Sequence, residues 1–498
     1  MPSILLYKIF FEDKDSMRVE LILPALPSWS VGSGSSVPPL GLLYIAEVLN
    51  KENHEVIVTD QQGENLSDEN LKRKIKKIDP DIVGFTTYSH SGRKAIKLAL
   101  DLREINPNLI IIFGGYFASF NAEKILETAP MAVDFCVRGE GEYTALELIN
   151  ALERKQELSE IRGITYRENG IIKSTPDRPI IKDLDALPIP DRTLVKGNKY
   201  GEYSNMSIDK FTSISSSRGC PFNCKFCLAT QWGRNKWRKR NFRKIADEFE
   251  YLIGLGYQNF LFVDDNFTAN RKHVILLSQE LKHRKFDINW FCEGRTTGGS
   301  IEMYSEMRYG GCKMIYLGFE SGTQRILDYY NKHTTIDQAV RTVEKIRKAQ
   351  IDMVTGSFIL GAPGETIQEL QNTIDFSLKL DIEAPLYGIL NVFKGTGIWD
   401  EYLAQGYIDP ETHWGKALPV CDIHPDCVPR DTIIEIINRG YQKALTRKKW
   451  YIKLFLRALK SRFRFKMFRK NISKRHEIAK RFKFSDIVQK DICLDEEN

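Results

Sequence analysis

Short apolar runs alternate with amphipathic helical patterns through residues 18–150. The run RVELILP precedes PLGLLYIAEVLNKENH, in which Leu42, Ile45, Ala46 and Leu49 recur at the spacing of one helix face. Further apolar runs, separated by patterns such as GRKAIKLALDLREI, are EVIVTD, DIVGFTTY, LIIIFGG and DFCVRGEGE. Buried strands that alternate with helices predict an α/β fold with a doubly wound, Rossmann-like parallel sheet, in which ligands bind at the carboxyl ends of the strands.

The alternation pauses over residues 151–205, a connector, and resumes over residues 206–400. GITYRENGIIKS predicts a hairpin around Asn169-Gly170, because a two-residue turn needs positive φ, and the prolines of LPIPDR mark a boundary. Six strand and helix units then predict a partial (β/α)6 barrel of TIM type, with its mouth lined by strand ends. Its strands are expected at FTSISSS, NFLFVDD, INWFCEG, KMIYLGFESG, MVTGSFILGAPGE and LYGILNVFKG. Residues 1–17 form an N-terminal extension, and residues 401–498 a mostly helical C-terminal region.

The bulk properties favour a multidomain cytoplasmic protein. A chain of 498 residues with 42% hydrophobic content is long enough for two or three cores. The N-terminal stretch lacks the pattern of a signal peptide, and no stretch holds eighteen uninterrupted apolar residues. Nine cysteines without a secretory signal indicate a reducing compartment, where clustered thiols more often bind metal or react than form disulfides.

Charge is concentrated in one C-terminal segment, residues 445–484. This segment holds sixteen Lys or Arg against one acid, Glu477, so it carries +15 and the remainder carries 7 − 15 = −8. Within KKWYIKLFLRALKSRFRFKMF, apolar residues at helical spacing alternate with basic ones, which predicts a basic amphipathic helix suited to an anionic membrane surface. A helix packed on the barrel with a solvated basic face is an equal alternative, and nucleic acid binding ranks third.

The stretch SSSRGCPFNCKFCLAT places Cys220, Cys224 and Cys227 directly after the first barrel strand. Four thiolates close a structural zinc or iron-sulfur site, whereas three thiolates on a four-iron cluster leave one iron open to a small ligand. A distant fourth ligand such as Cys292 is the alternative. The spacing and the position at the barrel mouth favour the open site.

RGCPFNCKFC resembles the signature of radical S-adenosylmethionine (radical SAM) enzymes, with Phe226 at the usual aromatic position. The resemblance implies a [4Fe–4S] cluster on Cys220, Cys224 and Cys227, and S-adenosylmethionine (SAM) chelated by the open iron. It also implies an electron donor such as ferredoxin or flavodoxin, and a 5′-deoxyadenosyl radical that abstracts hydrogen from unactivated carbon.

Later strand ends resemble the SAM-binding segments of this family. VDDNFT offers Asp264 and Asp265 in place of the family's glycines and glutamate at the amino-group motif, and GFESG offers Glu320 and Ser321 for the sugar or methionine part. GSFILGAPGET, which contains Gly361, resembles the stretch that flanks adenine. Each of these segments, considered alone, could instead be a helix cap or a turn. Their order along the chain after the cysteines favours the interpretation that they bind SAM.

The first domain resembles the cobalamin-binding domain that precedes radical SAM barrels in one large subgroup. The resemblance implies cobalamin contacts from two neighbouring strand ends: Thr86, Thr87, Tyr88, Gly114, Gly115 and Tyr116. The two glycines would let backbone approach the nucleotide tail of the cofactor. A dinucleotide fold is the competitor, but VGSGSS lacks the third glycine and the immediate helix of a Rossmann phosphate turn.

One departure from the wider cobalamin family affects the metal ligand. Many such domains carry an Asp-x-His-x-x-Gly motif after the first strand, and here that place reads PALPSWSVGSG. His54 and His90 lie elsewhere and are expected to be solvated or hydrogen-bonded. Cobalt is therefore expected to lack a protein histidine ligand, and loss of cobalamin stays an alternative.

The remaining cysteines give weaker signals. CDIHPDC, with Cys421, His424 and Cys427, has metal-like composition but is too compact for a zinc finger, so we expect a loop. Cys292 and Cys312 lie in apolar strands and are expected in the core. Residues 1–150 hold only Cys136, unlike the three-cysteine domain of tRNA-modifying methylthiotransferases, so nucleic acid is not the expected partner.

These features predict a cobalamin-dependent radical SAM methyltransferase that methylates an unactivated carbon of an apolar small molecule. One alternative is a radical SAM enzyme that cyclises or couples carbon, resembling the anaerobic magnesium-protoporphyrin ester cyclases. Another is a non-catalytic iron-sulfur or cobalamin-binding protein at the membrane. The apolar substrate is suggested only by the basic tail and by the bulky run PLYGILNVF.

Overall fold

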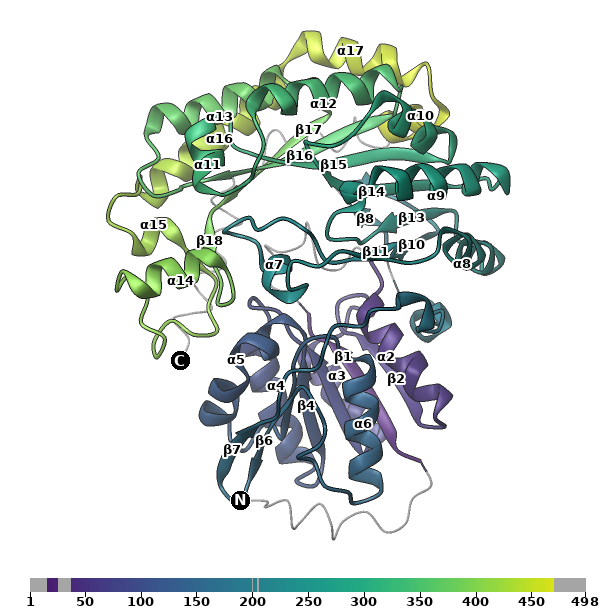
Figure 1. The fold of residues 1–498 in the computed structure, drawn as a ribbon, viewed down its shortest axis with the longest axis vertical. Coiled ribbons are helices and arrows are strands. Elements are labelled where there is room, and N and C mark those ends of the chain that lie inside the picture. The colour runs from purple at the N-terminus through teal and green to yellow at the C-terminus, as the bar shows by residue number, and fades with distance from the viewer. Residues whose placement is uncertain (1–15, 26–36, 199, 204–205, 470–498) are drawn as a thin grey trace. The chain divides into compact units, whose positions relative to one another are not determined.

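The structure is a computed structural model that describes residues 16–25, 37–198, 200–203 and 206–469 (Figure 1). The chain forms two compact units. Unit 1 comprises Met1–Tyr200 and Asp409–Ala417, and unit 2 comprises Gly201–Ile408 and Leu418–Asn498. A short piece of the C-terminal region therefore belongs to the N-terminal unit, which the sequence pattern did not indicate.

Unit 1 is built on a seven-stranded sheet of order β2-β1-β3-β4-β5-β6-β7. Its first five strands are parallel: β1 (Arg18–Leu23), β2 (Glu55–Asp60), β3 (Ile82–Thr86), β4 (Ile110–Gly114) and β5 (Phe135–Val137). The helices between them are α2 (Leu40–Lys51), α3 (Asp68–Ile78), α4 (Gly92–Ile105), α5 (Gly115–Thr128) and α6 (Glu142–Glu153). Helices α2 and α6 share one core with the sheet, and α3, α4 and α5 share another, so both faces are covered as expected.

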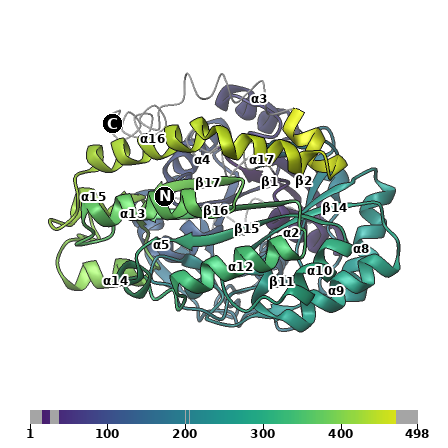
Figure 2. The same cartoon turned by 90° about the horizontal axis from the view of Figure 1, so that it is seen from above.

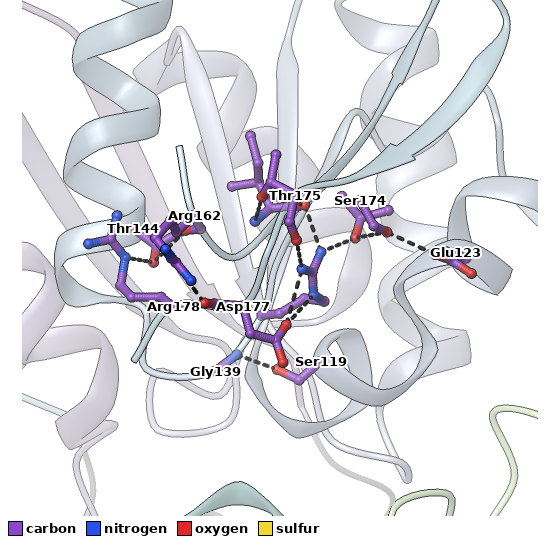
Figure 3. Close-up of polar contacts among 12 residues, drawn as sticks. Ser119, Glu123, Gly139, Thr144, Arg162, Ser174, Thr175, Asp177 and Arg178 are labelled. Atoms are coloured by element: carbon purple, nitrogen blue, oxygen red, sulfur yellow. Dashed lines mark hydrogen bonds and ion pairs between the residues drawn. The ribbon is translucent and has the colours of Figure 1, made fainter. Parts of the chain in front are cut away.

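The hairpin β6 (Ile164–Glu168) and β7 (Ile171–Ser174) extends this sheet in antiparallel fashion. Asn169 and Gly170 form its turn with φ of 51° and 81°, the positive values that the two-residue turn needs. Arg138, which follows β5, donates to the carbonyl oxygens of Ile164 and Thr175. Figure 3 shows the surrounding contacts, including Ser174 with Glu123 of α5. The hairpin part of the predicted connector, residues 164–174, is therefore part of the first sheet.

Residues 409–417 pack against α5 of unit 1. The Trp414 ring stacks on Phe117 with centroids 6.2 Å apart, and Glu411 pairs with Lys124. Phe117 is itself buried beneath α4, where a side chain at Gly92 would collide with its ring. This segment of the C-terminal region therefore covers the helix that begins at the Gly114-Gly115 pair.

Glu20 of β1 is a buried carboxyl group that makes the stability of unit 1 pH-dependent. Thr59 donates to one of its oxygens, and burial raises the pKa of Glu20 from 4.5 to about 7. The folded protein therefore holds a proton that the unfolded chain releases above pH 4.5, so stability falls as pH rises from about 4.5 to about 7. Glu20→Gln should remove this loss, about 3 kcal/mol at pH 8.

Denaturation curves at pH 5 and pH 8 measure this effect. Glu52→Gln, at an exposed position next to the start of β2, is the matched control and should keep the pH dependence of the unmodified protein. An equal fall in stability for Glu20→Gln and Glu52→Gln between the two pH values would contradict the assignment to Glu20.

Unit 2 is built on a six-stranded parallel sheet of order β10-β13-β14-β15-β16-β17. The strands are β10 (Phe211–Ile214), β13 (Asn259–Phe262), β14 (Asn289–Arg295), β15 (Cys312–Glu320), β16 (Met353–Leu360) and β17 (Ala384–Ile389). The helices α8 (Phe242–Gly254), α9 (Arg271–His283), α10 (Ile301–Tyr309), α12 (Ile336–Lys348) and α13 (Ile367–Lys379) connect them along one outer layer (Figures 1 and 2). Strands β10 and β17 are the edges, so this is the open, partial barrel that the sequence predicted.

Short elements complete unit 2. Helices α7 (Leu228–Trp232), α11 (Gln324–Tyr329), α14 (Gly397–Ala404) and α15 (Val420–Ile423) lie in its loops. Helix α16 (Arg430–Thr446) packs on β17 through Tyr441, whose hydroxyl accepts from Tyr387 N at 2.9 Å, and α17 (Lys448–Ala458) follows. Paired short strands are β8 (Glu202–Tyr203) with β9 (Met206–Ser207), β11 (Ser217–Arg218) with β12 (Arg238–Lys239), and β18 (Asn391–Val392) with β19 (Leu418–Pro419). Among the described residues, no helix is long and apolar enough to cross a bilayer.

Candidate active site

Strand β10 runs directly into the loop that holds the three cysteines. Arg240 Nη1 donates to Ser215 O at 2.8 Å and to the buried carboxylate of Glu248 at 2.6 Å, which fixes the end of the strand. Gly219 adopts φ of 82°, and a side chain there would collide with Lys236 O. The loop therefore starts from a rigid position at the carboxyl end of the barrel, where ligands bind in this fold.

The sulfurs of Cys220 and Cys227 accept hydrogen bonds from the backbone of their own loop. The donors are the N–H groups of Phe222 and Ala229, and Asn266 Nδ2 approaches Cys220 Sγ at 3.8 Å. Burial nevertheless raises the pKa of the Cys227 thiol to about 11. These sulfurs therefore become negatively charged thiolates at neutral pH only when a metal replaces the proton. The N–H donors would then stabilise the metal-bound thiolates.

Cys224 is buried and faces a cation from another strand. Arg295, the last residue of β14, donates from Nη1 to Cys224 Sγ at 3.1 Å and from Nη2 to Lys332 O. Its guanidinium lies over the Phe222 ring, 3.8 Å from the centroid. Arg295 Nε is buried and has no partner among the described residues. An orphaned N–H on a buried cation fits an acceptor that is part of a bound anionic group.

The three thiols of the cysteine loop are close neighbours. The charges of both Cys220 and Cys224 act on the Cys227 thiol. A [4Fe–4S] cube takes one thiolate on each of three different irons, so its ligands need not converge on a point. The cysteine loop therefore fits the cluster that the sequence predicted.

Asp264 and Asp265 lie at the end of β13 beside the cysteine loop. Asp264 is buried and accepts from Ser216 N at 2.8 Å and from the hydroxyls of Ser216 and Ser217 at 2.6 and 2.5 Å. Burial raises its pKa to about 6 despite these donors. Asp265 accepts from Gly219 N at 2.7 Å. Both carboxylates hold the cysteine loop in place, and SAM contact stays a prediction for them.

Glu320 and Ser321 lie at the end of β15. Glu320 adopts the left-handed region with φ of 66°, which is uncommon for a residue with a side chain and is found most often at functional sites. Its carboxylate is buried against Lys332 Nζ at 2.5 Å and Ser357 Oγ at 3.4 Å. Ser321 is fully buried, and its hydroxyl contacts Thr373 at 3.1 Å. The Glu320 and Lys332 pair therefore lies at the barrel mouth, whereas the Ser321 hydroxyl is directed toward Thr373 of helix α13.

Gly361 begins the loop after β16, which is held by a buried carboxylate. Gly361 has φ of 92°, and its N–H donates to Glu365 Oε2 at 2.8 Å, as does Ala362 N at 3.0 Å. Burial raises the pKa of Glu365 to about 7. Phe226 packs against the apolar cluster that contains Ala362, and its ring is edge-on to Tyr330 with centroids 5.2 Å apart. The structure thus brings every predicted SAM residue to the carboxyl ends of the barrel strands.

Two basic residues of this mouth, Arg295 and Lys332, were missed from the sequence. Arg295 had a usable signal, since it is a charged residue at the end of the strand INWFCEG. Lys332 had none, because it lies in a turn after α11 and reaches Glu320 only through folding. CDIHPDC forms α15 and a loop whose side chains have separate partners: Cys427 approaches Gly361 O at 3.8 Å, and His424 packs on Tyr402.

In unit 1, the predicted cobalamin residues gather at the ends of β3 and β4. Thr87 is fully buried, and its hydroxyl donates to Gly114 O at 2.7 Å and accepts from Ala118 N at 3.3 Å. Gly115 has φ of 88°, and a Cβ there would lie 2.7 Å from Thr87 O. Position 115 therefore needs a glycine because Thr87 leaves no room for a side chain. This reason differs from the one predicted from the sequence, which was the close approach of the cofactor's nucleotide tail.

The open part of this strand edge is aromatic. Tyr88 is 40% exposed, and its ring faces Tyr116 with centroids 6.2 Å apart. A side chain at Gly114 would meet nothing closer than 3.9 Å, so this backbone is accessible, and Thr86 is half-buried beside it. Exposed tyrosines next to bare backbone fit a large planar cofactor with a polar tail.

The structure confirms the hydrogen-bonded state that was expected for His54. His54 is buried and bonded at both ring nitrogens, to Met17 N at 3.3 Å and Asn150 Oδ1 at 2.9 Å. Burial lowers the pKa of His90 to about 4. Most of PALPSWSVGSG, the place of the missing histidine motif, lies outside the described residues.

Comparisons with known proteins agree with this geometry. Residues 214–377 match the model of the radical SAM superfamily, and residues 31–149 match the B12 binding domain. An uncharacterized methyltransferase of Pyrococcus horikoshii is 35% identical over 394 residues, which cover 79% of this chain and 84% of that relative. The chain belongs to the cobalamin-dependent radical SAM family.

Two further proteins of this kind are similar. The anaerobic magnesium-protoporphyrin IX monomethyl ester cyclase of Rubrivivax gelatinosus is 27% identical over 443 residues, covering 87% of this chain and 78% of the cyclase. The solved structure of the cobalamin-dependent radical SAM enzyme OxsB aligns with a TM-score of 0.69 at 16% identity, over 93% of this chain and 72% of OxsB, which shows the shared fold. The cofactors of this radical SAM enzyme are a [4Fe–4S] cluster, SAM and cobalamin.

Proposed function

We propose that this radical SAM enzyme methylates an unactivated carbon of an apolar small molecule. The observation that carries the proposal is the cysteine loop, in which three buried or half-buried thiols lie at the barrel mouth beside an orphaned arginine N–H. The likeness to a methyltransferase over 79% of the chain supports methyl transfer. When bound, the cluster with SAM supplies a hydrogen-abstracting radical and cobalamin supplies a transferable methyl group.

The residues of the mouth position and shield these groups. Cys220, Cys224 and Cys227 would hold the cluster, and Arg295 would hold an anionic acceptor next to it through its free Nε–H. Glu320, Asp265, Phe226 and Gly361 would lie around SAM at neighbouring strand ends, with Asp264 and Ser321 fixing the backbone behind them. In unit 1, Tyr88, Tyr116, Thr86 and the bare backbone of Gly114 and Gly115 would contact cobalamin, with Thr87 bracing the loop.

Water exclusion follows from the apolar packing behind the mouth. Tyr330 and Tyr402 are fully buried in one apolar cluster, and Phe226 packs against that cluster from the cysteine loop. An alkyl radical takes hydrogen from the nearest donor, so a dry wall protects it until methyl transfer. The same wall favours an apolar substrate over a charged one.

A second candidate function is cyclisation or carbon coupling. It is favoured by the likeness to the cyclase of Rubrivivax gelatinosus, which extends over 87% of this chain. That reaction class needs the radical but no methyl transfer, so the two candidates differ in their SAM products.

Anaerobic incubation of the reconstituted protein with SAM, cobalamin and a reductant distinguishes them. A methyltransferase should form both S-adenosylhomocysteine and 5′-deoxyadenosine. A cyclase should form 5′-deoxyadenosine without a matching amount of homocysteine product. Formation of neither product would support a non-catalytic scaffold and would overturn the proposal.

The remaining partners belong to the same proposal. A ferredoxin or flavodoxin would supply the electron for the cluster, because the family's radical chemistry begins by reduction. The protein would act in the cytoplasm, with peripheral contact between residues 445–484 and an anionic membrane, of which residues 470–484 lie outside the described chain. Nucleic acid is not a proposed partner.

A further inference from the structure

Helix α17 turns its apolar face away from the barrel. Ile452, Leu456 and Leu459 recur at helical spacing and are 61%, 55% and 58% exposed. Phe455 and Phe465 beside them are also exposed. Figures 1 and 2 show α17 as the yellow helix on the outside of unit 2. Five large apolar side chains on one short segment form a patch of the kind that marks an interaction site.

The opposite side of this segment is attached to the barrel through charge. Lys453 pairs with Asp381 at 2.9 Å, Arg457 pairs with the same carboxylate, and Arg464 pairs with Asp352 at 3.3 Å. An ordinary surface helix buries its apolar side and exposes its polar side. Here Ile452, Leu456 and Leu459 point to solvent, while the side toward the barrel carries Arg457 together with the buried Ala458. Packing on the barrel therefore does not explain these three large apolar residues.

The attachment lies at the amino ends of the barrel strands. Asp352 precedes β16, and Asp381 precedes β17. Residues 461–468 continue across this end, where Phe463 contacts Phe291 of β14 with ring centroids 5.9 Å apart and Met467 is buried. The exposed face of α17 is therefore at the end of the barrel opposite to the cysteine loop.

We propose that the exposed face of α17 binds an anionic lipid surface. Residues 448–469 contain nine Lys or Arg and no acid, and Lys448, Lys460, Arg462 and Arg469 are exposed around the apolar residues. Apolar side chains enter the boundary of headgroups and acyl chains while adjacent cations contact anionic headgroups. The sequence that follows, residues 470–484, is also basic.

Other occupants fit these residues less well. A second copy of the same face would bring two strongly basic surfaces together, which is unfavourable at physiological salt. A nucleic acid backbone would use the cations but would leave Ile452, Leu456 and Leu459 in water, since phosphate contacts do not bury aliphatic groups. Only a surface that is both anionic and apolar uses the two features together.

This inference rests on and deepens the membrane contact proposed above for residues 445–484, and it does not depend on the proposed catalytic function. Because the lipid-binding face and the cysteine loop lie at opposite ends of the barrel strands, docking leaves the mouth directed away from the bilayer. The membrane would then concentrate the enzyme at its surface, and the substrate would reach the mouth from the aqueous side or on a carrier.

Co-sedimentation of the full chain with vesicles tests the proposal, with phosphatidylcholine vesicles compared with vesicles that also contain phosphatidylglycerol. The unmodified protein should bind only the anionic vesicles, and the combined change Ile452→Ser, Leu456→Ser and Leu459→Ser should weaken binding at least about tenfold. The matched control is Ile301→Ser, Ile367→Ser and Leu403→Ser, three exposed apolar residues elsewhere in unit 2, which should bind like the unmodified protein.

A charge-reversed variant separates the two contributions. Lys448→Glu, Lys460→Glu and Arg462→Glu should abolish the preference for phosphatidylglycerol. Truncation is unsuitable as a test because residues 461–468 cover the barrel end. Equal binding of the serine variant and the unmodified protein, or no vesicle binding by the unmodified protein, would overturn the proposal. SAM cleavage in solution by the serine variant reports separately on the catalytic function.

Discussion

Cys224→Ala should abolish SAM cleavage while cobalamin stays bound. The loop offers one thiol for each of three irons, and without Cys224 the cluster loses the ligand that is most buried and that faces Arg295. Iron content after anaerobic reconstitution should fall below the level needed for an intact cube. Formation of 5′-deoxyadenosine should fall by at least about a thousandfold, because the radical arises only at the cluster.

Cys292→Ala is the matched control for the loss of a buried thiol. Cys292 lies in the hydrophobic core of the barrel, where its thiol interacts with Cys312. It can therefore contribute to stability, but it is not placed to bind the cluster. The Cys292→Ala protein should keep its iron and its SAM cleavage, with at most a modest loss of thermal stability. Retained cleavage in Cys224→Ala, or loss of iron in Cys292→Ala, would contradict the assignment of the cluster.

The fold and the cluster loop could be predicted because their signals are local. Each buried strand shows a short apolar run, several turns show a glycine or a proline, and the three thiols fall within eight residues. Parallel sheets place ligands at strand ends, so finding Asp264, Glu320 and Gly361 at the ends of three strands of one sheet was enough to predict that they lie around one mouth.

The partners of these residues could not be predicted because they come from distant parts of the chain. Asp264 bonds to Ser216 and Ser217, and Glu320 pairs with Lys332. Whether a carboxylate faces a ligand or braces a loop depends on such contacts, which leave no periodic pattern. The direction of α17 has the same origin, since the helix is held on the barrel by the pair of Arg457 with Asp381, and the segment after it by the pair of Arg464 with Asp352.

The charges around the cysteine loop indicate that the protein raises the reduction potential of the cluster. Arg295 and Lys332 are buried cations, and only Lys332 is paired with a carboxylate. A cube with three thiolates becomes more negative when it is reduced, so a fixed cation nearby favours the reduced state. Backbone N–H groups directed at Cys220 and Cys227 act in the same direction.

Arg295→Gln should therefore make the cluster harder to reduce. The substitution leaves a polar amide on a shorter side chain and removes the charge that lies 3.1 Å from Cys224 Sγ. The midpoint potential of the cluster, measured by redox titration with electron paramagnetic resonance, should become more negative, while the iron content stays unchanged. Loss of one charge-assisted hydrogen bond should slow SAM cleavage about ten- to a hundredfold.

Two further variants separate charge from packing at this position. Arg295→Lys keeps the charge but loses the fork that reaches both Cys224 and Lys332, so its potential should lie closer to that of the unmodified protein. Arg284→Gln removes an arginine that caps the carboxyl end of α9 and makes three surface ion pairs, and it should leave the potential unchanged. An unchanged potential in Arg295→Gln would show that Arg295 only fixes the loop, since a structural brace alters stability without altering the energy of the added electron.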